Sequence, residues 1–483
     1  MSRLVVGPFN RVEGDLEVRI EAEAGQVSSA WVNSPMYRGF EQILHGKDPG
    51  DALVYAPRIC GICSVSQSVA AAHAVRDALG AEAPPNGERL TNLVLAAENL
   101  ADHFTHFYLF FMPDFARAAY EGRAWHPDVV RRFRAEQGAA ATDAVAARAA
   151  FMNLMGVLAG KWPHTHTVQA GGAAKGVTGA EKLRVLSLLG QFRRYLEEHT
   201  FGDRLETVAA LAGGSDLAAW AAERGPEGSD LARFLRVAED VGLAELGRSH
   251  DRFMSYGSYP FQGERLFPGG VFAGGDLMPL DADAIREDLY SSWMSGAREP
   301  VHPYEGVTLP DAEREEAYSW CKAPRLAGRP VEVGALARQV VAGHPLIREL
   351  VAETGGNVRN RVVARLLELA RVVPAMEAWA RAIEPGEPFY REPGALQEGE
   401  GAGLVEAARG SLGHWIRVHN GRILNYQIVA PTTWNFSPRD RDGVPGPLEA
   451  ALEGAPVGAD ERTPVAVQHV VRSFDPCMVC TVH

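Results

Sequence analysis

Cysteine is scarce in this chain. Only five cysteines occur among 483 residues, and four of them form two CxxC pairs, Cys60/Cys63 and Cys477/Cys480, with Cys321 left over. A disulfide framework needs many cysteines in a short chain, so this usage favours thiol or metal chemistry. Cys321 is expected to be a buried packing residue.

Basic charge and long apolar runs are lacking too. The chain carries 48 Lys and Arg against 61 Asp and Glu, giving a net charge of −13, which argues against contacts with nucleic acid or an anionic membrane. It has no run of roughly 18 apolar residues that could span a bilayer. The N-terminus shows neither an apolar signal core nor a twin arginine. We therefore predict a cytoplasmic protein with no direct membrane span, unless a partner carries the targeting signal.

What the chain does contain is enough apolar sequence for a large core, since 46% of its residues are hydrophobic. No low-complexity linker or internal repeat marks a boundary, so residues 1–483 are expected to form a single domain. The patterns predict a mainly α fold with minor β (α+β), in which a bundle of long helices forms the core. Small β elements are expected at both ends of the chain.

The coarse element pattern is as follows. Strands are expected over residues 1–33, where Leu16, Val18 and Ile20 alternate with charged residues. The Asn420-Gly421 pair predicts a hairpin, whereas the Gly/Pro-rich residues 256–281 are expected to be irregular. Helices are predicted over residues 66–80, 87–113, 139–159, 180–200, 228–245 and 357–384.

The two CxxC pairs are the strongest chemical signal. Two residues between cysteines let both sulfurs reach one metal ion, and the start of the helix after Cys63 favours the thiolate. The spacing alone leaves three interpretations open: a structural zinc site with four cysteine ligands, a redox dithiol, and a redox-metal centre built on four thiolates.

The flanking residues distinguish these interpretations. R-x-C-G-x-C at residues 58–63 and D-P-C-x-x-C-x-x-H at residues 475–483 resemble the first and last signatures of nickel–iron hydrogenase large subunits. Six further blocks resemble the same family in the same order, and the resemblance runs from Arg11 to the last residue. These blocks are RVEG at 11–14, YRGFEQIL at 37–44, HFTHFY at 103–108, SWCKAPR at 319–325, ARGSLGHW at 408–415 and APTTWN at 430–435. A structural zinc protein becomes a remote alternative.

The resemblance implies a nickel–iron centre with carbon monoxide and two cyanide ligands on the iron. By the family pattern, Cys60 and Cys477 would bind nickel alone, and Cys63 and Cys480 would bridge nickel to iron. Because the protein cannot supply the diatomic ligands, maturation proteins are implied. Heterolytic cleavage of H2 needs an electrophilic metal and a nearby base, so the activity implied is an H2:acceptor oxidoreductase.

The resemblance also assigns roles to single residues. Glu13 matches the proton-transfer glutamate, although a glutamate at a strand edge is commonly just solvated. Arg409 matches a guanidinium above the metals, with Asp114 and Asp475 expected to orient it. Thr432 matches a position that hydrogen-bonds a cyanide. Surface or turn roles are the ordinary alternatives for these side chains.

A second metal site is implied near the last residue. Glu41 and His483, with a backbone carbonyl near Ile428, match the ligands of the family's magnesium site. Magnesium prefers oxygen ligands, so a histidine nitrogen is unusual there. Such an ion would tie the end of the chain to the loop after the first strands.

Several positions depart from the pattern of most catalytic members. Gln67 stands where a histidine is usual, and Ile62 and Phe110 stand where smaller residues are common. These residues, and the end of the sequence at His483 without a further peptide, resemble the hydrogen-sensing (regulatory) subgroup. If Ile62 and Phe110 line the gas channel, their bulk would admit H2 more readily than O2. We therefore expect slow, oxygen-tolerant turnover.

The sequence thus predicts the large catalytic subunit of a hydrogenase that passes electrons to an iron–sulfur small subunit, because the chain has no spare cysteines for a cluster of its own. The first interpretation is an H2 sensor that signals to a histidine kinase. In this interpretation, two pairs of large and small subunits would assemble into a dimer of heterodimers. The alternative is an energy-conserving uptake hydrogenase.

Overall fold

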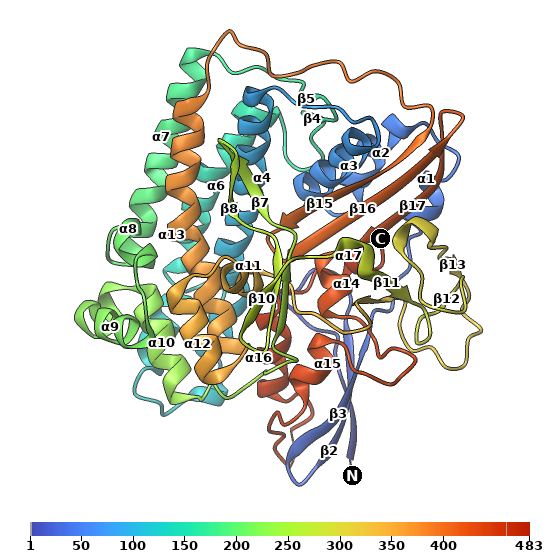
Figure 1. The fold of residues 1–483 in the computed structure, drawn as a ribbon. Coiled ribbons are helices and arrows are strands. Elements are labelled where there is room, and N and C mark those ends of the chain that lie inside the picture. Colours follow the sequence, from blue (N-terminus) through green and yellow to red (C-terminus); the bar gives the residue numbers. More distant parts are fainter. Residues whose placement is uncertain (1, 460) are drawn as a thin grey trace.

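The computed structural model describes residues 2–459 and 461–483, and its main body is a bundle of long helices beside a three-stranded sheet (Figure 1). The helices are α1 Phe40–Leu44, α2 Ala52–Tyr55, α3 Ser64–Ala78, α4 Pro85–Thr105, α5 His126–Phe133, α6 Ala140–Ala159, α7 Gly179–Tyr195, α8 Leu205–Ala209, α9 Gly214–Gly228, α10 Asp230–Asp240, α11 Ala335–Val341, α12 Pro345–Thr354, α13 Val358–Ala382, α14 Pro431–Asn435, α15 Pro447–Leu452, α16 Val465–Ser473 and α17 Met478–Thr481. The α+β class predicted from the sequence is confirmed.

The strands form several small antiparallel sheets instead of one large one. The two largest ladders are β1-β2-β3, near the N-terminus, and β15-β16-β17, near the C-terminus. The strands are β1 Ser2–Val6, β2 Glu17–Glu23, β3 Gln26–Asn33, β4 Val168–Gln169, β5 Gly172–Ala173, β6 Arg252–Ser255, β7 Ser258–Phe261, β8 Glu264–Phe267, β9 Gly270–Ala273, β10 Asp276–Met278, β11 Ile285–Asp288, β12 Met294–Ser295, β13 Leu309–Pro310, β14 Ala323–Leu326, β15 Gly399–Ala407, β16 Gly410–His419 and β17 Arg422–Val429.

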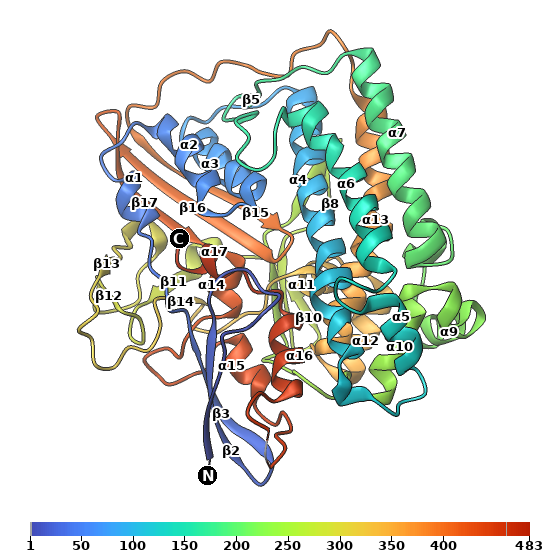
Figure 2. The ribbon, with the colours of Figure 1, turned by 180° about the vertical axis from the view of Figure 1, so that it is seen from behind.

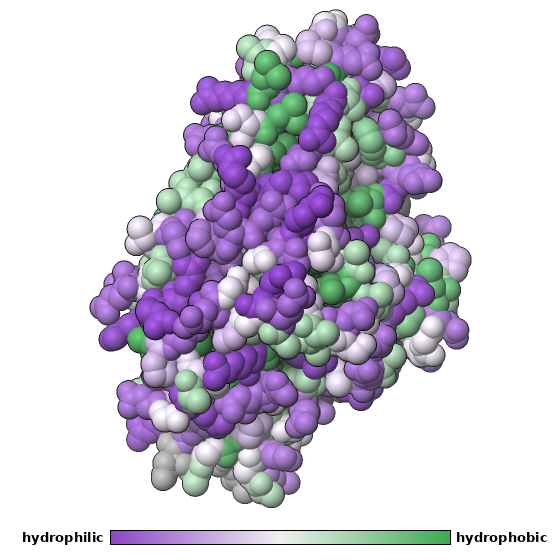
Figure 3. All heavy atoms as spheres, turned by 90° about the vertical axis from the view of Figure 1, so that its left-hand side faces the viewer, coloured by the Kyte–Doolittle hydropathy of each residue, from purple (hydrophilic) through white to green (hydrophobic). Residues whose placement is uncertain are grey.

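Helix α4 lies at the centre of the helical bundle. It packs against α6 and α13, and α13 also packs against α7 (Figure 2). Nearly all of α4 is buried, as its apolar sequence predicts for an internal helix. It passes into a π-helical turn at His106–Phe111, so the predicted helix over residues 87–113 ends earlier as an α-helix. Hydrophilic side chains cover most of the outer face of this bundle, with apolar ones in small separate groups (Figure 3).

Helix α3 packs directly on strand β15 because that strand is rich in glycine. A Cβ atom at Gly403 would lie 1.8 Å from the carbonyl oxygen of Ala70, and one at Gly401 would lie 2.3 Å from that of Ala74. Glycine at both positions therefore permits the close approach of helix to strand. The β15-β16-β17 sheet thus holds α3 in place, and α3 in turn positions Cys63, the residue that precedes its first turn.

The hairpin predicted at Asn420-Gly421 joins β16 to β17, with both turn residues at positive φ. The prediction of irregular structure for residues 256–281 was wrong, because β7 to β10 occupy most of this segment. Their ladders are only three or four residues long, and glycines punctuate them, so the segment lacks a visible strand period.

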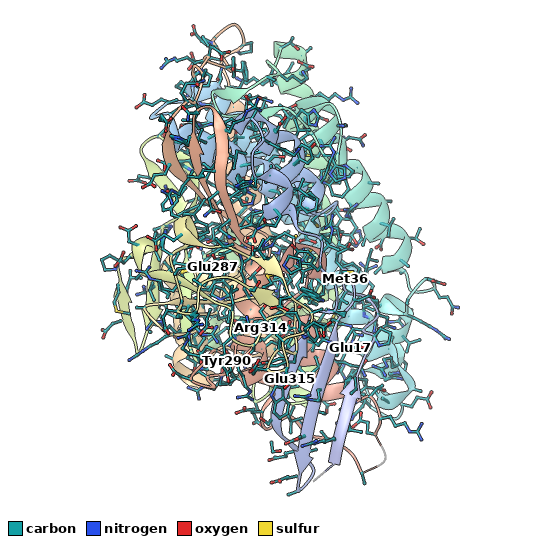
Figure 4. All side chains as sticks on the ribbon, turned by 90° about the vertical axis from the view of Figure 1, so that its right-hand side faces the viewer. Glu17, Met36, Glu287, Tyr290, Arg314 and Glu315 are labelled. Carbon is teal, nitrogen blue, oxygen red and sulfur yellow. The ribbon has the colours of Figure 1, made fainter. Side chains whose placement is uncertain are left out.

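A long segment, residues 289–322, connects β11 to β14. Figure 4 shows this segment, with Tyr290 and Arg314 labelled. Arg314 holds it together by donating to the carbonyl oxygens of Tyr290, at 3.1 Å, and Met294. None of the helices in residues 2–459 and 461–483 combines the length and apolarity needed to cross a membrane. The single domain predicted for the whole chain stays a prediction.

Candidate metal centre

The four paired cysteines meet in the interior. Their sulfur atoms all lie within 4.8 Å of one another, although more than four hundred residues separate the two pairs along the chain. The Sγ atoms of Cys63 and Cys480 are 2.8 Å apart, and those of Cys60 and Cys477 are 3.4 Å apart. All four are free thiols and all are buried. The structure therefore confirms that both CxxC pairs belong to one site.

The local backbone geometry positions the first cysteine pair in this cluster. Cys60 follows a short 3-10 turn and has an extended backbone, while Cys63 is the residue that precedes the first turn of α3. The amide N–H groups of Ile62 and Cys63 donate to the Cys60 sulfur at 3.3 and 3.4 Å. Such donors, at the positive end of a helix, stabilise a thiolate.

The protonation of the four thiols and their mutual repulsion indicate a metal site. Hydrogen bonds from Cys477, Cys480 and Cys63 lower the pKa of Cys60, whereas burial and the neighbouring thiols raise the pKa of Cys480. Four negative sulfurs this close together repel in a dry interior unless a cation compensates them. The donor set therefore fits a soft or borderline transition metal bound by four thiolates.

Glu13 is held against the second cysteine pair. It forms a parallel bridge with Cys477, in which its carbonyl oxygen accepts the N–H of Met478 at 2.8 Å. The side chain is half-buried, and burial, followed by the negative charge of Cys60, raises the pKa of Glu13 while Arg409 lowers it. A carboxylate beside thiolates with a raised pKa can accept and release a proton.

Arg409 is fully buried near the same cysteines, and the structure changes the pair of acids that hold it. Its guanidinium donates to the Asp475 carboxylate at 3.1 Å and to the Asp475 carbonyl oxygen at 2.7 Å. Its second carboxylate partner is Asp102, at 3.3 Å from Nη2 and in contact with Nη1. The fork geometry of arginine allows this simultaneous grip.

Asp114 was wrongly predicted as a partner of Arg409. Its carboxylate instead pairs with the guanidinium groups of Arg11 and Arg472 and lies 3.3 Å from His469. The pKa of Asp114 stays below its usual range because these cations outweigh the effect of burial. The signal for Asp102 was present in the sequence, as an acid in the middle of a helix too apolar to be exposed.

Thr432 lies next to the second cysteine pair, and its hydrogen bond to a cyanide ligand stays a prediction. Its hydroxyl oxygen accepts the backbone N–H of Cys477 at 3.2 Å, and the side chain is buried in α14. The hydroxyl proton stays available for another acceptor. Gln67 is also close, with its Nε2 atom 3.8 Å from the Cys480 sulfur and its Oε1 atom 2.7 Å from a ring nitrogen of His414.

The predicted magnesium ligands Glu41 and His483 are in contact, but a lysine sits between the acids. His483 Nε2 lies 3.1 Å from Glu41 Oε1, and the Lys322 ammonium lies 2.6 Å from the same oxygen. Lys322 also pairs with Glu287, which is labelled in Figure 4. Against the effect of burial, the charges of Lys322 and His483 keep the pKa of Glu41 below its usual value.

Ile428 also contacts this cluster, because its amide N–H donates to Glu41 at 2.9 Å. The role of a backbone carbonyl near Ile428 as a magnesium ligand stays a prediction. At this point Lys322 supplies a positive charge to the buried carboxylates of Glu41 and Glu287. The end of the chain is fixed in any case, because the carbonyl oxygen of His483 accepts the N–H of Phe40 at 3.0 Å. Cys321 is buried away from the four-cysteine cluster, as expected.

Glu98 supports the cysteine site from α4, and the sequence did not reveal this role. Its buried carboxylate accepts the N–H groups of Val65 and Ser66, at 2.8 and 2.9 Å, which are orphan donors of the first turn of α3. It also accepts both serine hydroxyls of that turn and the indole N–H of Trp162, at 2.9 Å. Burial raises the pKa of Glu98 to about 7, and the amides of Val65 and Ser66 oppose this rise. Glu98 thus fixes the turn that carries Cys63.

The family comparisons agree with this site. The model of the family described as nickel-dependent hydrogenase matches residues 38–121 and 229–483. The chain is 30% identical to the periplasmic [NiFeSe] hydrogenase large subunit of Desulfomicrobium baculatum, covering all of this chain and 95% of that protein. It is 29% identical to the uptake hydrogenase large subunit of Azotobacter chroococcum mcd 1, over 100% and 95% of the two chains.

Solved structures show the same likeness in three dimensions. The Ni-Fe-Se hydrogenase from D. vulgaris Hildenborough superposes with a TM-score of 0.84 at 30% identity, over the full length of both chains. The chain therefore belongs to the nickel-dependent hydrogenase family, and it is an oxidoreductase of that family, a hydrogenase large subunit. The four-cysteine cluster supports a nickel–iron centre in this chain.

The grip of Glu98 on α3 can be tested by Glu98→Gln. An amide cannot accept hydrogen bonds from all these donors, so we expect the free energy of unfolding to fall by about 2 kcal/mol. Chemical denaturation with circular dichroism measures this, and nickel content should fall in parallel. Glu88→Gln, the same change at an exposed position of α4, serves as the control. Equal stability of the two variants would contradict the assignment.

Proposed function

We propose that this chain oxidises H2 as the large subunit of an uptake-type [NiFe] hydrogenase and passes the electrons to an iron–sulfur small subunit. The observation that carries the proposal is the buried cluster of Cys60, Cys63, Cys477 and Cys480 with the half-buried Glu13 bridged to it. The small subunit follows from the relatives' description as large subunits and from the lack of further cysteines for a cluster here.

The residues of this chain divide the work. When bound, a nickel–iron centre supplies the electrophilic metal that polarises H2. Glu13 takes the proton, because its pKa is raised and it lies beside Cys477. Arg409, fixed by Asp102 and Asp475, holds a positive charge over the thiolates without being able to lose it.

The cluster also fits the diatomic ligands that the family pattern implies. The hydroxyl proton of Thr432 and the guanidinium of Arg409 are donors beside the cysteines, and carbon monoxide and two cyanides on an iron need such a polar but water-free surround. Maturation proteins would install them. A magnesium ion at Glu41 and His483 would have to displace the ammonium group of Lys322. The cytoplasmic location stays a prediction, and one of the relatives is named periplasmic.

A hydrogen sensor is the second candidate. It is favoured by Gln67, a neutral amide at Cys480, and by the bulky Ile62 and Phe110, both half-buried. The relatives named above are instead uptake and periplasmic enzymes, which supports the uptake role first. The kinase, the dimer of heterodimers and the oxygen tolerance belong to the sensor hypothesis alone.

Replacing Glu13 with glutamine tests the proposed function. An amide cannot carry the proton, so H2 oxidation with a dye acceptor should slow by at least about 100-fold, while nickel and iron contents stay at the wild-type level. Glu17→Gln is the matched control, because Glu17 is an exposed glutamate on the following strand, β2 (Figure 4). Full activity in Glu13→Gln would reject Glu13 as the base, and an inactive but fully loaded wild type would reject hydrogenase function.

The double substitution Ile62→Val with Phe110→Leu separates the two candidates. If these side chains narrow the gas channel, the variant should lose H2 oxidation activity in air within minutes while the wild type retains it. Activity under H2 before and after exposure to O2 measures the effect. If the wild type is itself inactivated by O2, or the variant is as tolerant as the wild type, the oxygen-tolerant sensor hypothesis fails and the uptake role stands.

A further inference from the structure

A cavity lies beside α3, lined by Val69, His73 and Arg76 of that helix, and no step of H2 oxidation uses it. Its volume is about 260 Å³, and it lies between α3, α4, the β7-β8 hairpin and β15. This is somewhat smaller than the cavities that bind drug-sized ligands. Its size therefore points to a small molecule.

The lining of the cavity contains polar groups without partners among the described residues. The hydroxyl of Ser258 is buried, with 6% of the residue exposed, and has no hydrogen-bond partner among the described residues. The imidazole of His73 makes no hydrogen bond in the same part of the chain. Burial, with the charges of Arg76 and Arg265, lowers the pKa of His73 to about 3, so the ring is neutral and can donate one N–H. Buried polar groups normally have a partner, and here the cavity is where one would bind.

The charge balance of the cavity favours an anion. One guanidinium nitrogen of Arg265 donates a hydrogen bond to the carbonyl oxygen of Tyr256, at 2.9 Å. The other donors of this guanidinium have no partner among the described residues. Arg76 adds a second positive charge, although its Nε and Nη2 atoms already donate to the carbonyl oxygens of Ala170 and Gln169, at 2.6 and 3.5 Å. Of the two lining carboxylates, Glu406 is engaged by Arg338, at 2.8 Å, whereas Glu88 is exposed at the mouth. Two guanidinium groups thus face one uncommitted carboxylate.

The rest of the lining is mostly apolar, and its polar members, Thr91 and Asn92, donate to the backbone carbonyl oxygens of Gly87 and Pro260. The side chains of Val69, Leu95 and Leu404 line the cavity together with the ring of Tyr259. An inorganic phosphate would leave this surface in contact with water, whereas an organic group would cover it. We propose that this cavity binds a small organic carboxylate, whose anionic end contacts Arg265, Ser258 and His73 and whose apolar end packs between α3 and α4.

Calorimetric titration of the purified full-length protein, with whatever subunit it copurifies, tests the proposal with benzoate as the probe. Saturable binding of one benzoate per chain is expected. Arg265→Gln should weaken it about tenfold or more, because a charge-assisted hydrogen bond is lost. Ser258→Ala should also weaken it. Arg286→Gln is the matched control, since Arg286 likewise donates to backbone carbonyl oxygens but lies outside the cavity, and it should bind as the wild type does.

Two further probes define the ligand class. Benzamide, which is neutral but has the same shape, and inorganic phosphate, which lacks the apolar group, should each bind at least about tenfold more weakly than benzoate. Equal binding of benzamide would overturn the anionic assignment, and tighter binding of phosphate would overturn the organic one. Absence of saturable benzoate binding, or equal binding by Arg265→Gln and Arg286→Gln, would overturn the site itself. None of these outcomes depends on hydrogenase activity.

Discussion

The structure depends on the meeting of four thiols from opposite ends of the chain inside a dry interior. Cys60 and Cys63 lie within the first 63 residues of the sequence, and Cys477 and Cys480 within its last seven. Ionised sulfurs at 2.8 to 3.4 Å repel one another, and neutral ones gain little from this proximity. Only a bound cation makes the arrangement favourable, so the metal and the closure of the fold are linked in one equilibrium.

The surrounding residues hold the two cysteine pairs in place. On one side Glu98 holds the first turn of α3, and on the other the bridge from Glu13 holds the extended backbone at Cys477. Asp102 lies one helical turn beyond Glu98 on α4, so a single buried helix positions both the cysteine loop and Arg409. The rigidity of the site therefore comes from α4 and from the glycine-mediated contact of α3 with β15.

Much of this could be predicted from the sequence, and the failures have physical reasons. The long helices and the Asn420-Gly421 hairpin follow from periodicity and turn chemistry, and the four cysteines follow from their flanking motifs. The strands β7 to β10 were missed because short ladders between glycines have no detectable period. Asp114 was predicted from the family resemblance to orient Arg409, whereas the tertiary contacts bring Asp102 to that guanidinium and pair Asp114 with Arg472.

Lys322 shows a different kind of limit. The sequence pattern indicated ligands for an ion at Glu41 and His483, but it gave no sign that a lysine from a distant block would lie within 2.6 Å of the same carboxylate. Glu98 was hidden for a similar reason, since its importance lies in the backbone amides that it accepts and not in its neighbours along the chain. Charges inside an apolar helix are the one signal that sequence offers for such residues.

Metal analysis of the purified protein, combined with its infrared spectrum, tests the central claim most directly. The account predicts nickel and iron in equal amounts, bound by the four cysteines, with bands from carbon monoxide and cyanide on the iron. Removal of one thiol by Cys477→Ser should abolish both metals together. Zinc alone, in a protein without such bands, would contradict the account.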